Sequence, residues 1–197
     1  MGAPKMLLPW NGTSVLGHLV FVWKQLQAAQ VIVVCAADDA GVQRELDKLQ
    51  VPVESRAYNK APEQGMFSSI KCAGNFPWNP EITHVALVLG DQPHLCKSTL
   101  RHFLQFASTH PQNISQPSRR QHGRHPVILP RDLLRQAVHS DAATLKEFVQ
   151  KRECDRVLFE TEDAGFDLDI DYPEDYRKAL QLDAAYSESE PPLSHPS

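Results

Sequence analysis

Short apolar runs alternate with segments of helical periodicity along most of this chain. Runs at 31–36, 51–53, 85–89, 127–129 and 157–159 are typical of buried strands, and a further strand is expected near Ile114. Between them, apolar side chains recur every three or four residues, which predicts helices at about 14–29, 42–49, 65–70, 98–107 and 145–149, and from Pro130 and Pro173 onward. This alternation predicts an α/β fold in which helices cover the faces of a mostly parallel sheet.

The length and composition are those of a single globular domain. The chain has 197 residues, of which 42% are hydrophobic and 22% are charged, so it can bury one substantial core. We assign residues 1–185 to this domain. Ser, Glu and Pro dominate residues 186–197, and we therefore expect a disordered tail there.

Charge and cysteine usage narrow the classes of partner. The formal net charge of −4 argues against a general nucleic-acid binder, which usually carries a basic face. An acidic protein that handles an anionic substrate needs local lysines and arginines, or a bound cation. The four cysteines are scattered without paired spacing, which favours a reduced, cytoplasmic setting. No apolar run approaches the length of a membrane span, so no membrane partner is expected.

The most informative segment is the apolar run 85–89, which Gly90, Asp91 and Gln92 follow directly. In open α/β sheets, ligands gather outside the carboxyl ends of the strands. An aspartate at such a position is well placed to hold a metal ion against a phosphate. The plainer alternative is a turn aspartate, since Gly-Asp-x-Pro is ordinary turn chemistry.

Four further polar blocks fall at expected loops. Lys5 follows a small-residue turn, and Asn59 precedes a helix start at 64–69 that favours an anion. A basic loop covers 123–126, and acids gather at 167–175, at the mouth of the last helix. Each block has an ordinary structural explanation: helix capping for the serines, dipole interactions for the acids, and a solvated basic loop for the arginines.

In their order and spacing, these blocks resemble the MobA-like nucleotidyltransferases, and most closely the molybdenum cofactor cytidylyltransferases. The resemblance runs from Met1 to about Leu180 and rests on five motifs: Met-Gly-x-x-Lys-x-Leu-Leu-Pro, Gly-Met-x-x-Ser, Leu-Gly-Asp-Gln-Pro, Gly-His-Pro-Val and Asp-Ile-Asp-x-Pro-Glu-Asp-Tyr. In the fourth motif the chain departs from the family, because Arg124 stands where the family usually has Gly. It implies a three-layer Rossmann-like nucleotidyltransferase fold. It also implies Mg²⁺-dependent transfer of CMP from CTP to the molybdopterin-type molybdenum cofactor, with release of pyrophosphate.

The resemblance assigns roles to particular residues of this chain. Lys5 and Asp91 are the expected catalytic residues. The expected metal ligands are Asp91, Asp169 and Asp171, the nucleotide-binding residues are Asn59, Gly65, Ser68, Ser69 and Gln92, and the acceptor-binding residues are Arg124 and His125. Partners are CTP or another NTP and the molybdenum cofactor, and the resemblance also suggests contacts with molybdoenzymes or their chaperones.

The chain departs from the family at its start. The family has a strand and the loop Leu-Ala-Ala-Gly-x-Ser-x-Arg directly before Met-Gly, and here the sequence starts at that Met. The first strand, which would be central in the sheet, is therefore expected to be missing. Either upstream residues have been omitted, which the intact later motifs favour, or catalysis has been lost. A related transferase with another phosphorylated acceptor and a non-catalytic nucleotide- or cofactor-binding protein remain the alternatives.

Overall fold

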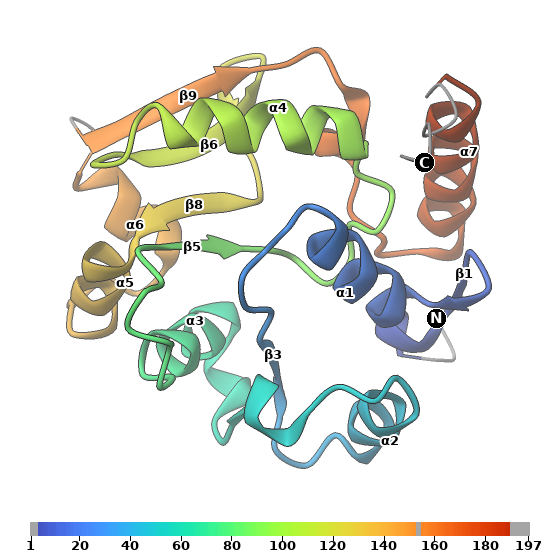
Figure 1. Ribbon diagram of the computed structural model, residues 1–197, viewed down its shortest axis with the longest axis horizontal. Helices are drawn as coiled ribbons and strands as arrows, with labels where there is room; N and C mark the ends of the chain where they lie inside the picture. Colours follow the sequence, from blue (N-terminus) through green and yellow to red (C-terminus); the bar gives the residue numbers. More distant parts are fainter. Residues whose placement is uncertain (1–3, 153–154, 190–197) are drawn as a thin grey trace, which may run out of the picture.

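The computed structural model describes residues 4–152 and 155–189 and has the α/β architecture that the sequence predicts (Figure 1). The helices are α1 (Val15–Gln25), α2 (Ala40–Lys48), α3 (Met66–Gly74), α4 (Lys97–Ser108), α5 (Arg131–Val138), α6 (Leu145–Gln150) and α7 (Pro173–Ser189). The strands are β1 (Pro9–Trp10), β2 (Thr13–Ser14), β3 (Val33–Ala36), β4 (Arg56–Asn59), β5 (His84–Leu87), β6 (Ile114–Arg119), β7 (His122–Gly123), β8 (Val127–Pro130) and β9 (Arg156–Glu160). Short 3-10 turns include η1 (Lys5–Leu7), η2 (Val53–Ser55), η3 (Pro62–Gln64) and η5 (Ala164–Asp167).

The larger sheet has five strands and is mixed. β5 pairs with β8 and β8 with β6 in antiparallel fashion, whereas β6 pairs with β9 in parallel. The reversal occurs at Arg120 and Gln121, whose positive φ angles of 52° and 64° close a tight turn between β6 and β7. Because the chain turns back here, β8 returns between β5 and β6, and the expectation of a mostly parallel sheet does not hold for this part.

Helices cover both faces of the five-stranded sheet. On one face, Val85 and Leu129 pack with α3, α5 and α6 through Phe67, Leu134 and Phe148. On the other face, Ile128 of β8 packs with Phe103 and Ala107 of α4. The two-residue alternation along β5 and β8 thus gives three layers, helix–sheet–helix, as expected for a strand that is buried on both sides.

The remaining parallel strands form a separate pair, β3–β4, and the sheet is divided between β3 and β5. Within the described ranges, β3 is hydrogen-bonded to β4 and β5 to β8, with no strand between them. An apolar cavity of about 670 Å³ lies at this division.

Most helices and strands lie where the sequence predicts them, and two segments differ. Ser14 caps α1 as predicted, because its Oγ accepts a hydrogen bond from the Gly17 amide at 3.0 Å. The strand expected at 51–53 was wrong: Pro52 lacks an N–H, residues 53–55 form η2, and β4 begins only at Arg56. The loop expected at 117–124 is largely the β6–β7 hairpin.

The last helix extends beyond the predicted domain end. α7 continues to Ser189, four residues past residue 185, because the Tyr186 hydroxyl donates a hydrogen bond to Asp163 and ties this part of the helix to the domain. The tail predicted at 186–197 therefore does not begin at 186. The rest of that segment, 190–197, lies outside the described residues.

Candidate active site

A charged cluster lies where β5 ends, and it brings together residues that are far apart in the sequence. The Lys5 ammonium of η1 lies 3.4 Å from Asp91 Oδ2 and 2.5 Å from Asp171 Oδ1. Asp91 follows β5, and Asp171 precedes α7. The structure therefore places the predicted catalytic lysine between two of the three predicted metal ligands.

Asp169, the third predicted ligand, is held beside Asp91 from two sides. The Gln92 side-chain amide donates to Asp169 Oδ1 at 2.8 Å, and the Ile170 amide donates to the Asp91 carbonyl at 3.2 Å. Gln92 is buried, and its Oε1 has no partner among the described residues. Its predicted contact with the nucleotide is untested, and the observed hydrogen bond gives it a positioning role for Asp169.

The charges in this cluster shift the pKa values of their neighbours. Partial burial raises the pKa of the Asp169 carboxyl, and the neighbouring negative charges of Asp91 and Asp171 raise it further. Burial acts to lower the pKa of Lys5, but the hydrogen bond to Asp171 and the charge of Asp91 outweigh it, so this pKa is raised. Lys5 pairs with two of these carboxylates and the third, Asp169, lies beside them, which leaves an excess of negative charge that a cation would neutralise.

A second, neutral cluster joins the end of β4 to the start of α3. The Asn59 amide donates to Ser68 Oγ at 2.7 Å and to Ser69 Oγ at 3.0 Å. Its Oδ1 accepts from the Ala61 amide at 2.9 Å, so the buried side chain has all its polar atoms engaged. Asn59, Ser68 and Ser69 were all predicted to bind the nucleotide, and the structure brings their side chains together.

Gly65 lies directly before α3 with a φ of 82°, a left-handed conformation that suits glycine. The Ser68 hydroxyl donates to the Gly65 carbonyl at 2.7 Å. Met6, Ser69, Gly90 and His125 all line the cavity between β3 and β5. The neutral cluster thus reaches this cavity through Ser69, and the charged cluster adjoins it through Met6 and Gly90, the chain neighbours of Lys5 and Asp91.

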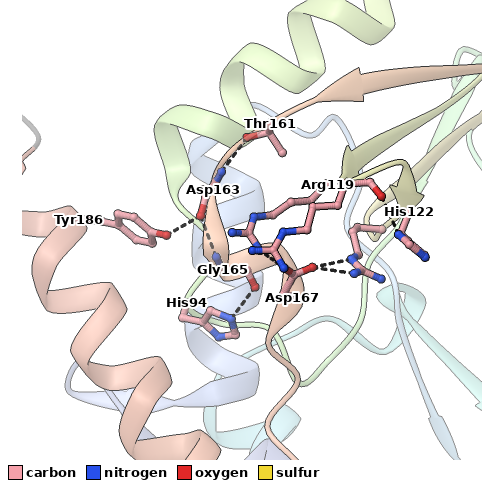
Figure 2. A network of polar contacts seen from close by, with 10 residues as sticks. His94, Arg119, His122, Thr161, Asp163, Gly165, Asp167 and Tyr186 are labelled. Atoms are coloured by element: carbon pink, nitrogen blue, oxygen red, sulfur yellow. Dashed lines mark hydrogen bonds and ion pairs between the residues drawn. The ribbon is translucent and has the colours of Figure 1, made fainter.

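The predicted acceptor residues, Arg124 and His125, lie just before β8. His125 Nδ1 is 3.2 Å from the Leu87 carbonyl, and burial lowers the pKa of the His125 imidazole, so the ring is neutral at pH 7. Arg124 donates to Asp167 Oδ1 at 2.6 and 3.0 Å, and Arg119 pairs with the other oxygen of the same carboxylate (Figure 2). Arg124 is thus an ion-pair partner and not a solvated loop residue.

The polar network in Figure 2 was not expected from the sequence. Asp163 accepts hydrogen bonds from the Gly165 amide, at 2.9 Å, and from the Tyr186 hydroxyl. The fully buried His94 contacts the Gly165 carbonyl through Nε2 at 3.0 Å. This network fixes the segment that carries Asp167 and Asp169 against α7. Its sequence signal was weak, because an acid within a run of acids gives no indication of which basic group it meets.

Comparison with known proteins identifies the family. The sequence profile of the MobA-like NTP transferase domain matches residues 1–157. The chain belongs to the MobA-like NTP transferase family. Among curated proteins, no sequence match was found.

Solved structures share the fold of this MobA-like domain. A nucleotidyl transferase from Methanothermobacter thermautotroptrophicus is 17% identical, with a TM-score of 0.73 over 94% of this chain and 86% of its own. Rv0371c from Mycobacterium tuberculosis H37Rv is 21% identical, with a TM-score of 0.71 over 92% and 91% of the two chains, and has also been solved as a complex with manganese. Molybdopterin-guanine dinucleotide biosynthesis protein A from Archaeoglobus fulgidus is 14% identical, with a TM-score of 0.63 over 93% and 92%.

The chemistry of the donors in this MobA-like domain fits a divalent cation. In the part of the chain that the structure describes, no three acidic, His or Cys side chains already converge as a metal site. Mg²⁺, however, is usually held by one or two carboxylates together with substrate phosphates. The mutual repulsion that helps to raise the Asp169 pKa is what such a cation would relieve.

In 4–152 and 155–189, no helix has the length and apolarity needed to cross a membrane.

Proposed function

We propose that this MobA-like transferase moves CMP from CTP to the terminal phosphate of the molybdenum cofactor, with release of pyrophosphate. The observation that supports the proposal is that one cavity is lined by Ser69 of the neutral cluster and by Met6 and Gly90, the chain neighbours of Lys5 and Asp91 in the charged cluster. The preference for CTP and for this acceptor rests on the resemblance of Leu-Gly-Asp-Gln-Pro and His-Pro-Val to the cytidylyl branch of the family.

The charged cluster supplies what nucleotidyl transfer needs most, which is neutralisation of charge on the attacked phosphate. Asp91, with Asp169 or Asp171, would hold Mg²⁺, which supplies positive charge at the phosphate oxygens. Lys5 already bridges Asp91 and Asp171 and would screen the triphosphate or the incoming phosphate. Gln92 keeps the Asp169 carboxylate oriented through its 2.8 Å hydrogen bond.

The neutral cluster supplies position. Asn59 fixes the hydroxyls of Ser68 and Ser69 in the first turn of α3. Hydroxyls and backbone N–H groups at a helix start bind an anion without adding a net charge. We assign this side of the cavity to the nucleotide.

The basic residues of the β6–β8 region would meet the acceptor. Arg119 and Arg124 present two guanidinium groups that share the single carboxylate of Asp167, so their net charge stays positive, and arginine is well suited to bidentate phosphate contacts. His125 follows Arg124, is close enough to Asp91 to feel its charge, and as a neutral ring can accept or donate a hydrogen bond without adding charge. Described cysteines 35, 72 and 96 are free thiols, which agrees with the cytoplasmic setting that we propose.

The direct test is pyrophosphate release by the 197-residue chain with Mg²⁺ and molybdenum cofactor, comparing CTP with GTP and ATP. We expect release that depends on the acceptor and is at least about tenfold faster with CTP. Equal rates for all three nucleotides would overturn the CTP assignment. Release that ignores the molybdenum cofactor but responds to another phosphorylated acceptor would overturn the acceptor assignment.

The division of the sheet favours a second candidate, a nucleotide-binding protein without transfer activity. Met6, the chain neighbour of Lys5, lines the cavity at this division, and we place the triphosphate beside Lys5. This candidate predicts that CTP binds in the presence of Mg²⁺ but that no pyrophosphate appears with any acceptor. Binding and release measured on the same sample separate the two functions.

A further inference from the structure

A second cavity lies between the carboxyl end of α3 and α5. Its volume is about 460 Å³, which is within the range of small-molecule pockets. We call it the arginine pocket, and it is lined by residues 74–78 and by Arg131, Arg135, Val138 and His139. Ser68 and Ser69 of the neutral cluster are in the first turn of α3, at the opposite end of that helix. The arginine pocket is therefore separate from the candidate active site.

The pocket is bounded by two helices that lie side by side (Figure 1). They approach closely at Gly74, where an added Cβ would clash with a methyl group of Val138. Directly after Gly74 the chain turns, because the Phe76 amide donates to the Ala73 carbonyl at 3.1 Å and the Trp78 amide donates to the Phe76 carbonyl at 2.9 Å. Contacts within the chain thus fix the walls of the pocket without a ligand.

One wall of the pocket is aromatic. The rings of Phe76 and Trp78 meet edge to face, with centroids 5.4 Å apart. The Trp78 indole N–H donates to the Ala73 carbonyl at 2.8 Å, which fixes the orientation of this ring. Ordered aromatic rings can pack against a planar ligand at a small cost in conformational entropy.

The wall formed by α5 is positively charged. Arg131, Arg135 and His139 follow one another at intervals of four residues, which places them along one face of the helix. The lining of the pocket contains no acidic residue. Arg131 Nη1 donates to the carbonyl oxygens of Asn79 and Ile82 at 3.0 and 3.3 Å, and in the described ranges no carboxylate pairs with this guanidinium. Its position is fixed while its charge is not neutralised.

Arg135 can turn to a ligand at little cost. Its side chain is 60% exposed, and its ion pair with Asp132, which is 86% exposed, has an N–O distance of 3.8 Å. Such an exposed pair contributes little free energy, so a ligand can replace it. The carboxyl ends of α3 and α5 each add about half a negative charge, which the two guanidinium groups exceed.

We propose that the arginine pocket binds a phosphomonoester with a planar ring, of the class of the nucleoside monophosphates. A phosphomonoester carries a charge of about −1.5 to −2 at pH 7 and three acceptor oxygens, which match two guanidinium groups. Its ring would pack against Phe76 and Trp78. Inorganic phosphate would leave the aromatic wall without a partner, and an uncharged ring would leave the arginines without one.

The probe is adenosine 5′-monophosphate (AMP), titrated into the 197-residue chain in EDTA and followed by isothermal titration calorimetry. EDTA removes the divalent cations that would assist nucleotide binding at the charged cluster. Adenosine and inorganic phosphate are titrated separately as the two halves of the ligand. We expect AMP to bind at least about tenfold more tightly than either half. No binding of AMP, or an affinity equal to that of either half, would overturn the proposal.

Variants locate the site. Arg135→Gln removes one guanidinium group from an exposed side chain and should weaken AMP binding at least about tenfold. Phe76→Ala should weaken AMP binding but leave the binding of inorganic phosphate unchanged. Arg101→Gln, at an exposed arginine of α4, is the matched control and should bind AMP as the unchanged chain does. Binding that Asp91→Asn weakens and Arg135→Gln leaves unchanged would assign AMP to the candidate active site and overturn the proposal.

Hydrogen exchange on the unchanged chain decides the question even if a variant fails to fold. On addition of AMP, backbone exchange should slow in residues 75–78 and in α5, and remain unchanged in the β6–β7 hairpin. Protection confined to other parts of the chain would overturn the proposal. Because no step of this test measures CTP turnover, its outcome is independent of the proposed transfer reaction.

Discussion

The two polar clusters of the candidate site are built in different ways. The neutral cluster joins Asn59 to serines nine and ten residues later, and its hydrogen bonds are complete without a ligand. The charged cluster joins Lys5 to aspartates 86 and 166 residues away, and it carries more negative than positive charge. The neutral cluster is local in sequence and has all its hydrogen bonds made. The charged cluster joins distant parts of the chain and has an excess of negative charge.

This difference indicates which cluster does which work. A self-satisfied neutral cluster holds its geometry whether or not a ligand is present, which suits positioning. A cluster with excess negative charge changes its free energy strongly when a cation or a triphosphate arrives, which suits charge stabilisation. Substitutions in the charged cluster should therefore reduce turnover, and those in the neutral cluster should affect stability and nucleotide affinity.

The largest effect is expected for Asp91→Asn. This change keeps the size of the side chain but removes the charge at the end of β5, and we expect kcat to fall by about 10³-fold because a key electrostatic contact is lost. Circular dichroism should remain unchanged, since the backbone bond from Ile170 to the Asp91 carbonyl is kept. Asp132→Asn, at an exposed surface acid, is the matched control. Full activity in Asp91→Asn would show that this carboxylate has no part in the reaction.

Lys5→Met should lower kcat by about 10²-fold, because the positive charge that bridges Asp91 and Asp171 is lost while the length of the side chain is kept. Lys5→Arg restores the charge and should recover part of the rate. Steady-state kinetics of both variants, with exposed Lys48→Met as the control, provide the comparison. A kcat for Lys5→Met equal to that of the unchanged chain would contradict the assigned role.

Asn59→Ala should act mainly on stability and affinity. Removing the buried amide leaves Ser68, Ser69 and the Ala61 amide without their partner, at a cost of about 1–3 kcal/mol in the free energy of unfolding. The KM for CTP should rise more than kcat falls. Urea denaturation measures the stability change, and Asn75→Ala at an exposed position should shift it by less than about 0.5 kcal/mol. If kcat falls sharply with KM unchanged, the division of labour between the clusters is wrong.

The smallest effect is expected for Asp169→Asn on stability. The Asp169 pKa is raised above its usual 3.8 in the folded state, so the folded protein favours the protonated form. Its contribution is therefore most favourable below the unfolded pKa and is lost as the pH rises through the folded pKa. Asp169→Asn should raise the urea midpoint at pH 7, and the gain should vanish below about pH 4. A gain of equal size at both pH values would mean that charge repulsion is not its cause.

The neutral cluster could be predicted from the sequence better than the charged cluster, because its residues are close in sequence. Asn59, Ser68 and Ser69 are close in sequence, and a strand end followed by a helix start places them together by local geometry alone. The link from Lys5 to Asp171 depends on the whole fold, and only the family resemblance predicted it. The pairing of Asp167 with Arg119 and Arg124 was missed, because it depends on how η5 lies against β6.

The helices and strands show the same limit: local signals were predicted well, and long-range pairing was not. Periodicity located the buried strand before Asp91 and the cap of α1 at Ser14, since burial and capping are local signals. β4 was placed too early, because the valines around Pro52 looked like a strand although the pairing with β3 begins at Arg56. The mixed sheet followed from a turn at Arg120 and Gln121 that has no glycine to mark it.

The most direct test of the central claim is the affinity of the chain for CTP with and without Mg²⁺, measured by isothermal titration calorimetry. We predict that Mg²⁺ tightens CTP binding at least about tenfold, that Asp91→Asn removes this dependence, and that Asn59→Ala weakens binding but keeps the dependence. An affinity that Mg²⁺ leaves unchanged, or a dependence that survives in Asp91→Asn, would contradict the claim that the charged cluster is the metal-assisted half of a nucleotide site.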